Sequence, residues 1–177
     1  MKKRIISLVV VATMLVLALT GCGIFGSGNG ADENTPSDGV KITDKFSLVA
    51  PEGLDYDKAY VVKVEPSPDN IVGDYNAENG MLALYVVVYA KDDAAVGEYN
   101  VYVLPDQAGV DYMIDEAGEG VYTIPEEDPY VLTYFNDKDA VTANITMYQG
   151  YGMLNDPCTA ADYAEVCADM YGGYIVE

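Results

Sequence analysis

The chain has 177 residues, a formal net charge of −20 and no histidine or tryptophan. Histidine is the usual general base near neutral pH, so its absence excludes Ser-His-Asp and Cys-His catalysis and imidazole-bound zinc. The scarcity of basic residues also excludes a nucleic-acid partner, because little would neutralise a phosphate backbone. We therefore expect a protein that is not an enzyme.

The first 22 residues have the order of a secretory signal. A basic start, Met1–Arg4, precedes the uncharged run Ile5–Leu19, which falls short of the roughly 20 apolar residues of a membrane-spanning helix. The following Leu19-Thr20-Gly21-Cys22 resembles the lipobox of bacterial lipoproteins. The resemblance implies cleavage before Cys22 and lipid on its thiol, and two or three acyl chains make such an anchor permanent.

This resemblance predicts an extracytoplasmic protein attached to the cell membrane through the lipid on Cys22. Gly23 follows in place of the aspartate associated with inner-membrane retention, so in a cell with two membranes the outer one is an alternative. Cleavage would leave six lysines against 29 acidic residues, a formal charge of −23. That charge favours a soluble surface. It also leaves a carboxylate site for Ca²⁺ as an alternative, because this cation prefers oxygen ligands.

Composition then divides the chain into three parts. Residues 1–22 form the lipoprotein signal peptide, and residues 23–40 are a Gly-, Ser- and Asn-rich acidic stretch that cannot bury apolar area. Such a tether spans roughly 20–25 Å. Residues 41–177 are long enough for one β-rich globular domain.

Short stretches rich in β-branched and aromatic residues predict an antiparallel sheet of about six to eight strands. Met81–Ala90 is apolar at every position, which indicates a strand covered on both faces. Asn79-Gly80 before it is typical of a hairpin turn. The other predicted strands are Lys45–Ala50, Ala59–Glu65, Ile71–Asn76, Glu98–Leu104, Val110–Ile114, Gly120–Ile124, Tyr130–Phe135 and Val141–Tyr148.

One amphipathic helix is predicted near the C-terminus, over Thr159–Tyr171. Thr159 can cap it together with Asp162, and Gly172-Gly173 ends it. We expect this helix to cover the doubly apolar strand, with Tyr174–Val176 returning as a short strand. The fold class is therefore α+β, with one C-terminal helix packed on a face of the sheet, and a β-sandwich is the alternative.

Cys158 and Cys167 are the two cysteines of the predicted domain. Two cysteines outside the cytoplasm usually form a disulfide. A helix from Thr159 would however hold them about 13 Å apart, whereas a disulfide needs Cα atoms within about 7 Å. A disulfide and two buried thiols both remain alternatives at this point.

Two further stretches are candidate sites. Asp74–Gly80 resembles the start of a calcium loop, but Gly80 is one place late and Tyr85 stands where the bidentate glutamate is needed, which favours a turn. Tyr148 and Tyr151 flank glycine in a predicted loop, and exposed tyrosines there would suit a protein or carbohydrate partner.

Phe46-Ser47-Leu48-Val49-Ala50-Pro51-Glu52-Gly53, followed by a sheet and a late helix, resembles small lipoproteins with PsbP-like domains. That resemblance implies a non-catalytic accessory role. We therefore expect a membrane-anchored binding or accessory module that needs no cofactor. The alternatives are a carboxylate-rich protein that binds divalent cations and a small carboxylate-dependent hydrolase.

Overall fold

The computed structural model describes residues 39–117, 122–123 and 130–176. The predicted signal peptide, Cys22 and the tether up to residue 38 lie outside this range. The strands are β1 (Val40–Lys41), β2 (Ser47–Leu48), β3 (Lys58–Val64), β4 (Ala83–Lys91), β5 (Ala94–Leu104), β6 (Tyr122–Thr123), β7 (Tyr130–Asn136) and β8 (Tyr174–Val176). The helices are α2 (Ile71–Asn79), α3 (Gln107–Ala117), α4 (Lys138–Gly150) and α5 (Ala160–Tyr171).

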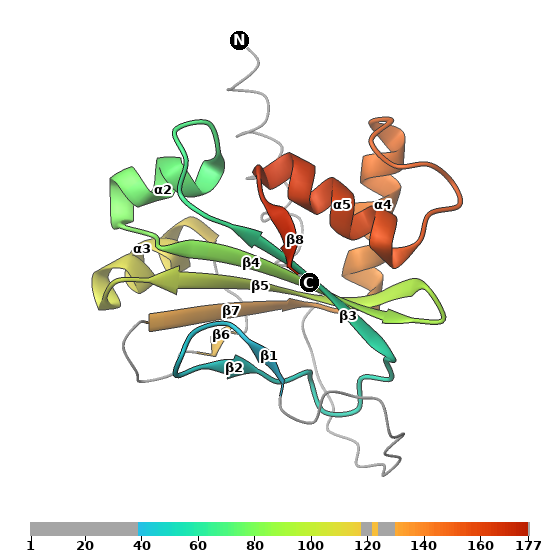
Figure 1. The fold of residues 1–177 in the computed structure, drawn as a ribbon, viewed down its shortest axis with the longest axis horizontal. Helices are drawn as coiled ribbons and strands as arrows, with labels where there is room; N and C mark the ends of the chain where they lie inside the picture. Colours follow the sequence, from blue (N-terminus) through green and yellow to red (C-terminus); the bar gives the residue numbers. More distant parts are fainter. Residues whose placement is uncertain (1–38, 118–121, 124–129, 177) are drawn as a thin grey trace.

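The main sheet has the order β6-β7-β5-β4-β3-β8, and every neighbouring pair is antiparallel (Figure 1). β6 has only two residues, so five longer strands make up most of this sheet, and β1 and β2 form a separate hairpin. The predicted α+β class is confirmed, and the β-sandwich alternative is wrong. The sheet is smaller than predicted and the helices more numerous.

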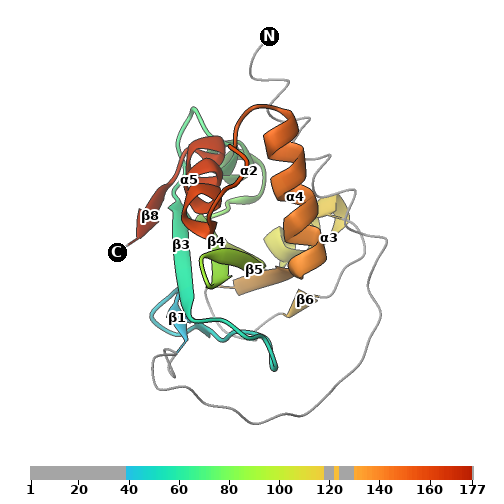
Figure 2. The same ribbon diagram turned by 90° about the vertical axis from the view of Figure 1, so that its right-hand side faces the viewer.

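The two faces of the sheet are covered by different layers. Side chains of all four helices pack on one face, where they join the even-numbered apolar residues of β3 and β4 in one core (Figure 2). The β1–β2 hairpin and the segment after it cover the other face, and Ile42 and Leu48 enter a second, smaller core there. We call these the helix face and the hairpin face.

β4 lies at the centre of both layers, as its sequence predicts. Val86 and Val88 are fully buried in the helix-face core, whereas Val87 and Tyr89 are buried in the hairpin-face core. Successive side chains of a strand point to opposite faces, so only a strand covered on both sides can be apolar throughout.

The C-terminal helix also agrees with the sequence. Thr159 is the N-cap of α5 and forms a capping box with Asp162, and Gly172 ends the helix with a left-handed backbone. α5 buries Tyr163, Cys167 and four other residues against β3 and β4. β8 then returns along β3, with Ile175 opposite Val62.

Three predicted strands are wrong because each is a helix. Val141–Tyr148 belongs to α4, Val110–Ile114 to α3 and Ile71–Asn76 to α2. β-branched residues in these segments suggested strands, but the residues buried in α4, Val141, Asn144 and Tyr148, are spaced as on one face of a helix. Tertiary packing of these stripes on the sheet outweighs the weak local preference for a strand.

The predicted Asn79-Gly80 hairpin is wrong for a related reason. Gly80 has φ 75°, and its N–H bonds to the carbonyl of Asn76, so it caps the C-terminus of α2. A positive φ serves a tight hairpin and a helix end equally well. The N-cap Asn70, whose side chain accepts from the N–H of Gly73, is the signal that distinguishes them.

Gly73 is required by a close backbone approach, which gives a direct test of the α2 packing. A Cβ at Gly73 would lie 1.8 Å from the carbonyl oxygen of Ser67, so Gly73→Ala should lower the free energy of unfolding by about 1–3 kcal/mol. The control is Gly150→Ala in α4, where a Cβ meets nothing within 4 Å and should raise stability by up to about 1 kcal/mol. Urea denaturation measures both, and equal effects would contradict this packing.

Candidate functional site

The structure separates the two tyrosines predicted to bind a partner. Tyr148 lies in α4, is only 2% exposed and packs against Tyr163 at a ring distance of 6.0 Å. The prediction that Tyr148 is a binding residue is therefore wrong, because this stretch is helical and its ring faces the sheet. Tyr151 follows the end of α4 and is exposed, as is Met153.

Both domain cysteines are free thiols in this structure. Cys167 is buried within α5, and Cys158 is half-buried just before the N-cap of that helix. Burial raises the pKa of each thiol, and the carboxylate of Glu98 adds to the rise at Cys167. Neither thiol has the lowered pKa or the open surroundings of a reactive cysteine.

The most concentrated polar chemistry lies under the helices, around the buried carboxylate of Glu98 in β5. Its Oε2 accepts from the Tyr163 hydroxyl at 2.6 Å, and its Oε1 accepts from the side-chain amides of Asn100 and Asn136 at 2.8 Å each. Asn144 of α4 donates to the Tyr163 hydroxyl at 3.4 Å. We call Glu98, Asn100, Asn136, Asn144 and Tyr163 the Glu98 cluster.

The buried carboxylate of Glu98 is stabilised in this cluster by hydrogen bonds from uncharged side chains. Among the described residues, the partners of Glu98 are amides and a phenol rather than a lysine. Burial, with the charge of Glu98, raises the pKa of Tyr163 well above its usual value, which keeps the hydroxyl protonated as a donor. Charge-assisted hydrogen bonds of this length are among the stronger ones in proteins.

The accessibility of the cluster limits what it can do chemically. Glu98 is 3% exposed and Tyr163 1% exposed, so neither can reach a substrate in solution. General acid–base chemistry needs a group within hydrogen-bond reach of the substrate. The cluster instead fixes α4 and α5 to β5 and β7, and we assign it a structural role.

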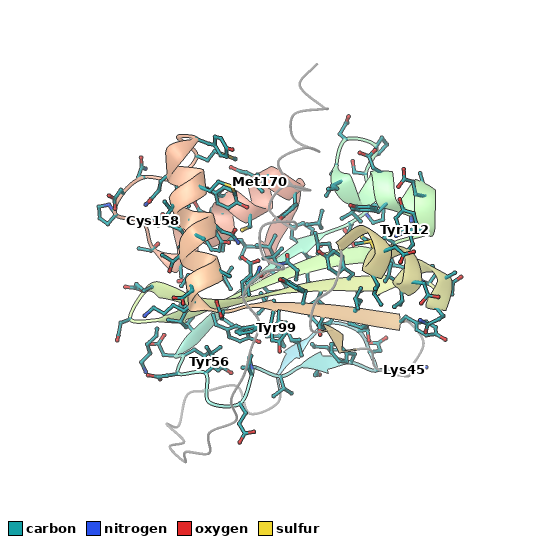
Figure 3. The ribbon with its side chains drawn as sticks, turned by 180° about the vertical axis from the view of Figure 1, so that it is seen from behind. Lys45, Tyr56, Tyr99, Tyr112, Cys158 and Met170 are labelled. Carbon is teal, nitrogen blue, oxygen red and sulfur yellow. The ribbon has the colours of Figure 1, made fainter. Side chains whose placement is uncertain are left out.

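On the hairpin face an aromatic row crosses β4, β5 and β7. The ring of Tyr89 lies 4.8 Å from Tyr56 and 6.3 Å from Tyr99, and Tyr99 lies 4.8 Å from Phe135. Figure 3 shows Tyr56 and Tyr99 on the side of the sheet away from the helices. Tyr89 is 1% exposed, so this row is mainly core packing.

Two exposed apolar side chains lie at the β8 end of the same face. Tyr174 and Val176 are 49% and 41% exposed. They stand opposite Lys63 and Val61 of β3, and Lys63 in turn stands opposite Tyr85 of β4. We call these five residues the β8 patch.

Lys63 in the middle of this patch is already neutralised. Its ammonium bonds to Glu65 at 2.8 Å, which raises the pKa of Lys63, and lies 6.0 Å from the ring centre of Tyr85. The pKa of Glu65 is lowered by Lys63 and, to a smaller extent, by a hydrogen bond from Tyr174. The patch therefore combines two aromatic rings, aliphatic groups and a paired charge on one face of the sheet.

No family model, curated protein or solved structure matches this chain. Within the described ranges, no three His, Cys, Asp or Glu residues converge as metal ligands, and no helix is long and apolar enough to cross a bilayer. Asp74–Gly80 lies on α2 and its C-cap rather than in a loop that could surround Ca²⁺.

Sequence reasoning missed both the Glu98 cluster and the β8 patch. One signal for the cluster was present, since Glu98 interrupts an apolar strand at a position that alternation assigns to the buried face. The cluster member on α4, Asn144, could not be found, because that segment is predicted as a strand. The patch depends on β8 lying beside β3, and no local pattern encodes that pairing.

Removing one donor tests the assignment of the Glu98 cluster. Tyr163→Phe leaves the buried carboxylate short of one hydrogen bond, so the free energy of unfolding should fall by about 1–3 kcal/mol. The matched control is Tyr112→Phe, which removes an equally short bond of 2.6 Å to Glu78 on the surface and should cost under about 1 kcal/mol. If urea denaturation gives the two variants equal losses in the free energy of unfolding, the Glu98 cluster does not have the structural role assigned to it.

Proposed function

We propose that this protein is an extracytoplasmic lipoprotein, anchored through lipid on Cys22, whose folded part is a non-catalytic binding module. The lipobox-like Leu19-Thr20-Gly21-Cys22 supports the anchor. The β8 patch supports the binding role and is the observation that carries it. An exposed tyrosine beside aliphatic groups, as Tyr174 is here, is typical of protein interfaces.

Three observations favour binding over catalysis. The chain has no histidine, and the best-organised carboxylate, Glu98, is buried beneath two helices. The β8 patch contains no group placed to transfer a proton, since Lys63 is held by Glu65. A surface of this kind can hold a partner but offers it no reaction.

A lipid anchor on Cys22 and a binding surface at the β8 patch are compatible with a domain held away from the membrane surface. The segment between Cys22 and β1 is long enough, at roughly 20–25 Å, to hold the domain clear of the lipid headgroups. The acidic surface repels the anionic lipid of a membrane, which keeps the domain from lying on it. The module would therefore meet partners in the space outside the membrane.

Metabolic labelling tests the anchor. Radiolabelled palmitate should appear in the protein expressed in a bacterium that processes lipoproteins, and Cys22→Ala should abolish the label because the acceptor thiol is gone. Cys158→Ala is the control and should keep full labelling. Label that persists in the Cys22 variant, or an intact N-terminal methionine on the membrane-bound protein, would contradict lipid attachment at Cys22.

Matched double variants test the binding surface. Tyr174→Ser with Val176→Ser removes the exposed side chains of the β8 patch, whereas Tyr151→Ser with Met153→Ser removes a similar pair from the α4–α5 connection. In chemical crosslinking on intact cells, the first pair should lose partner adducts at least fivefold, and the second should keep them. The opposite pattern would move the interface to the α4–α5 connection.

A further inference from the structure

β8 is the last strand in the order of the main sheet, and among the described residues no strand covers its outer edge. It pairs with β3 on one side, and no other described strand pairs with its far side (Figure 1). An open edge presents unpaired N–H and C=O groups that can accept another strand. The backbone of β8 is therefore itself a candidate binding surface.

The sequence of β8 lacks the usual protection of an edge. Tyr174-Ile175-Val176 contains no proline and no charged residue, and all three residue types favour strands. Of the devices that commonly protect an edge strand, β8 has only its short length of three residues. An edge of this composition suits pairing with an extended segment.

β8 is also held firmly in place. The N–H of Gly173 bonds to the carbonyl of Ala168 at 2.8 Å, and Asn70 donates to the carbonyl of Gly172 at 3.4 Å. Ile175 packs against the helix-face core, which leaves Tyr174 and Val176 to the hairpin face. A partner strand would meet a preformed edge and would not have to order it first.

The charge around β8 favours a basic segment of a partner over a second copy of this chain as the strand that pairs with its edge. Lys63 is paired with Glu65, and Glu165 and Asp169 are exposed on α5, the helix that packs beside β8. The chain as a whole has a net charge of −20, so a second copy would be repelled. A segment with basic residues would be attracted to the same surface.

We propose that the outer edge of β8 binds an extended, cationic segment of a partner protein by strand addition. Backbone hydrogen bonds to β8 supply the affinity in this mode, while alternate apolar side chains of the segment lie beside Tyr174 and Val176. Basic residues at the remaining positions lie on the helix face of the sheet, the side of α5 with its exposed Glu165 and Asp169. This inference rests on the proposed binding function and specifies how that function is performed.

The test uses the complete lipidated chain in nanodiscs of zwitterionic phosphatidylcholine. The probe is a fluorescent ten-residue peptide of alternating lysine and valine, and its anisotropy measures binding against empty nanodiscs. A peptide of alternating glutamate and valine controls for charge. Two further copies of the lysine peptide, N-methylated at one or the other set of alternate residues, control for backbone pairing without changing the protein.

The lysine peptide should bind, and the glutamate peptide should bind at least tenfold more weakly. One of the two N-methylated peptides should also bind at least tenfold more weakly, because an added strand makes all its hydrogen bonds to β8 through one of its two edges. Hydrogen exchange of the amides in Tyr174–Val176 should slow on binding. The Tyr174→Ser, Val176→Ser variant should weaken binding at least fivefold, and the Tyr151→Ser, Met153→Ser variant should not.

Equal binding by all the lysine peptides, or protection of amides away from β8, would overturn strand addition. Slowed exchange in β8 that rises with protein concentration without peptide, together with a dimer in sedimentation, would identify a second copy as the occupant and would equally overturn the proposal. The two proposals fail separately. If cellular crosslinks depend on Tyr174 and Val176 while N-methylation has no effect, strand addition is overturned, but the proposed binding function stands because the module binds there through side chains.

Discussion

The structure depends on β4 being apolar on both faces. Val86 and Val88 bury into the core beneath the helices, while Val87 and Tyr89 bury beneath the β1–β2 hairpin. Each fully buried side chain of this size contributes about 1.5–3 kcal/mol, so neither layer can leave without exposing half of the strand. The helices and the β1–β2 hairpin are thereby both packed on one sheet, in which β4 lies between β5 and β3.

Polar chemistry inside this framework is used for attachment. Glu98 replaces an apolar residue at the point where α4 and α5 meet the sheet, and its three donors come from β5, β7 and α5. Breaking a buried, fully bonded charge is costly, so such a group favours one arrangement of the helices over alternatives. The chemically richest site of the molecule therefore positions its elements, and the surface available to partners lies elsewhere.

How far the sequence predicts this structure differs between elements. β4 and α5 could be predicted because their patterns are local, an unbroken apolar run in one and a capping box with a glycine stop in the other. α4 could not be predicted from residue preference, because Val141, Thr142, Ile145 and Thr146 favour strands, whereas the N-cap Asp137 and packing on the sheet select the helix. The Glu98 cluster and the β8 patch join residues far apart in the sequence, so no local pattern shows which residues they bring together.

The pairing of β3 with β8 has a consequence for the order of folding. Synthesis produces Lys58–Val64 early, yet its outer neighbour Tyr174–Val176 is the last strand described. Pairings between such distant segments form slowly, and until then β3 is the bare margin of the nascent sheet. A growing chain must therefore keep β3 from pairing with strands of other molecules until Tyr174–Val176 has been synthesised.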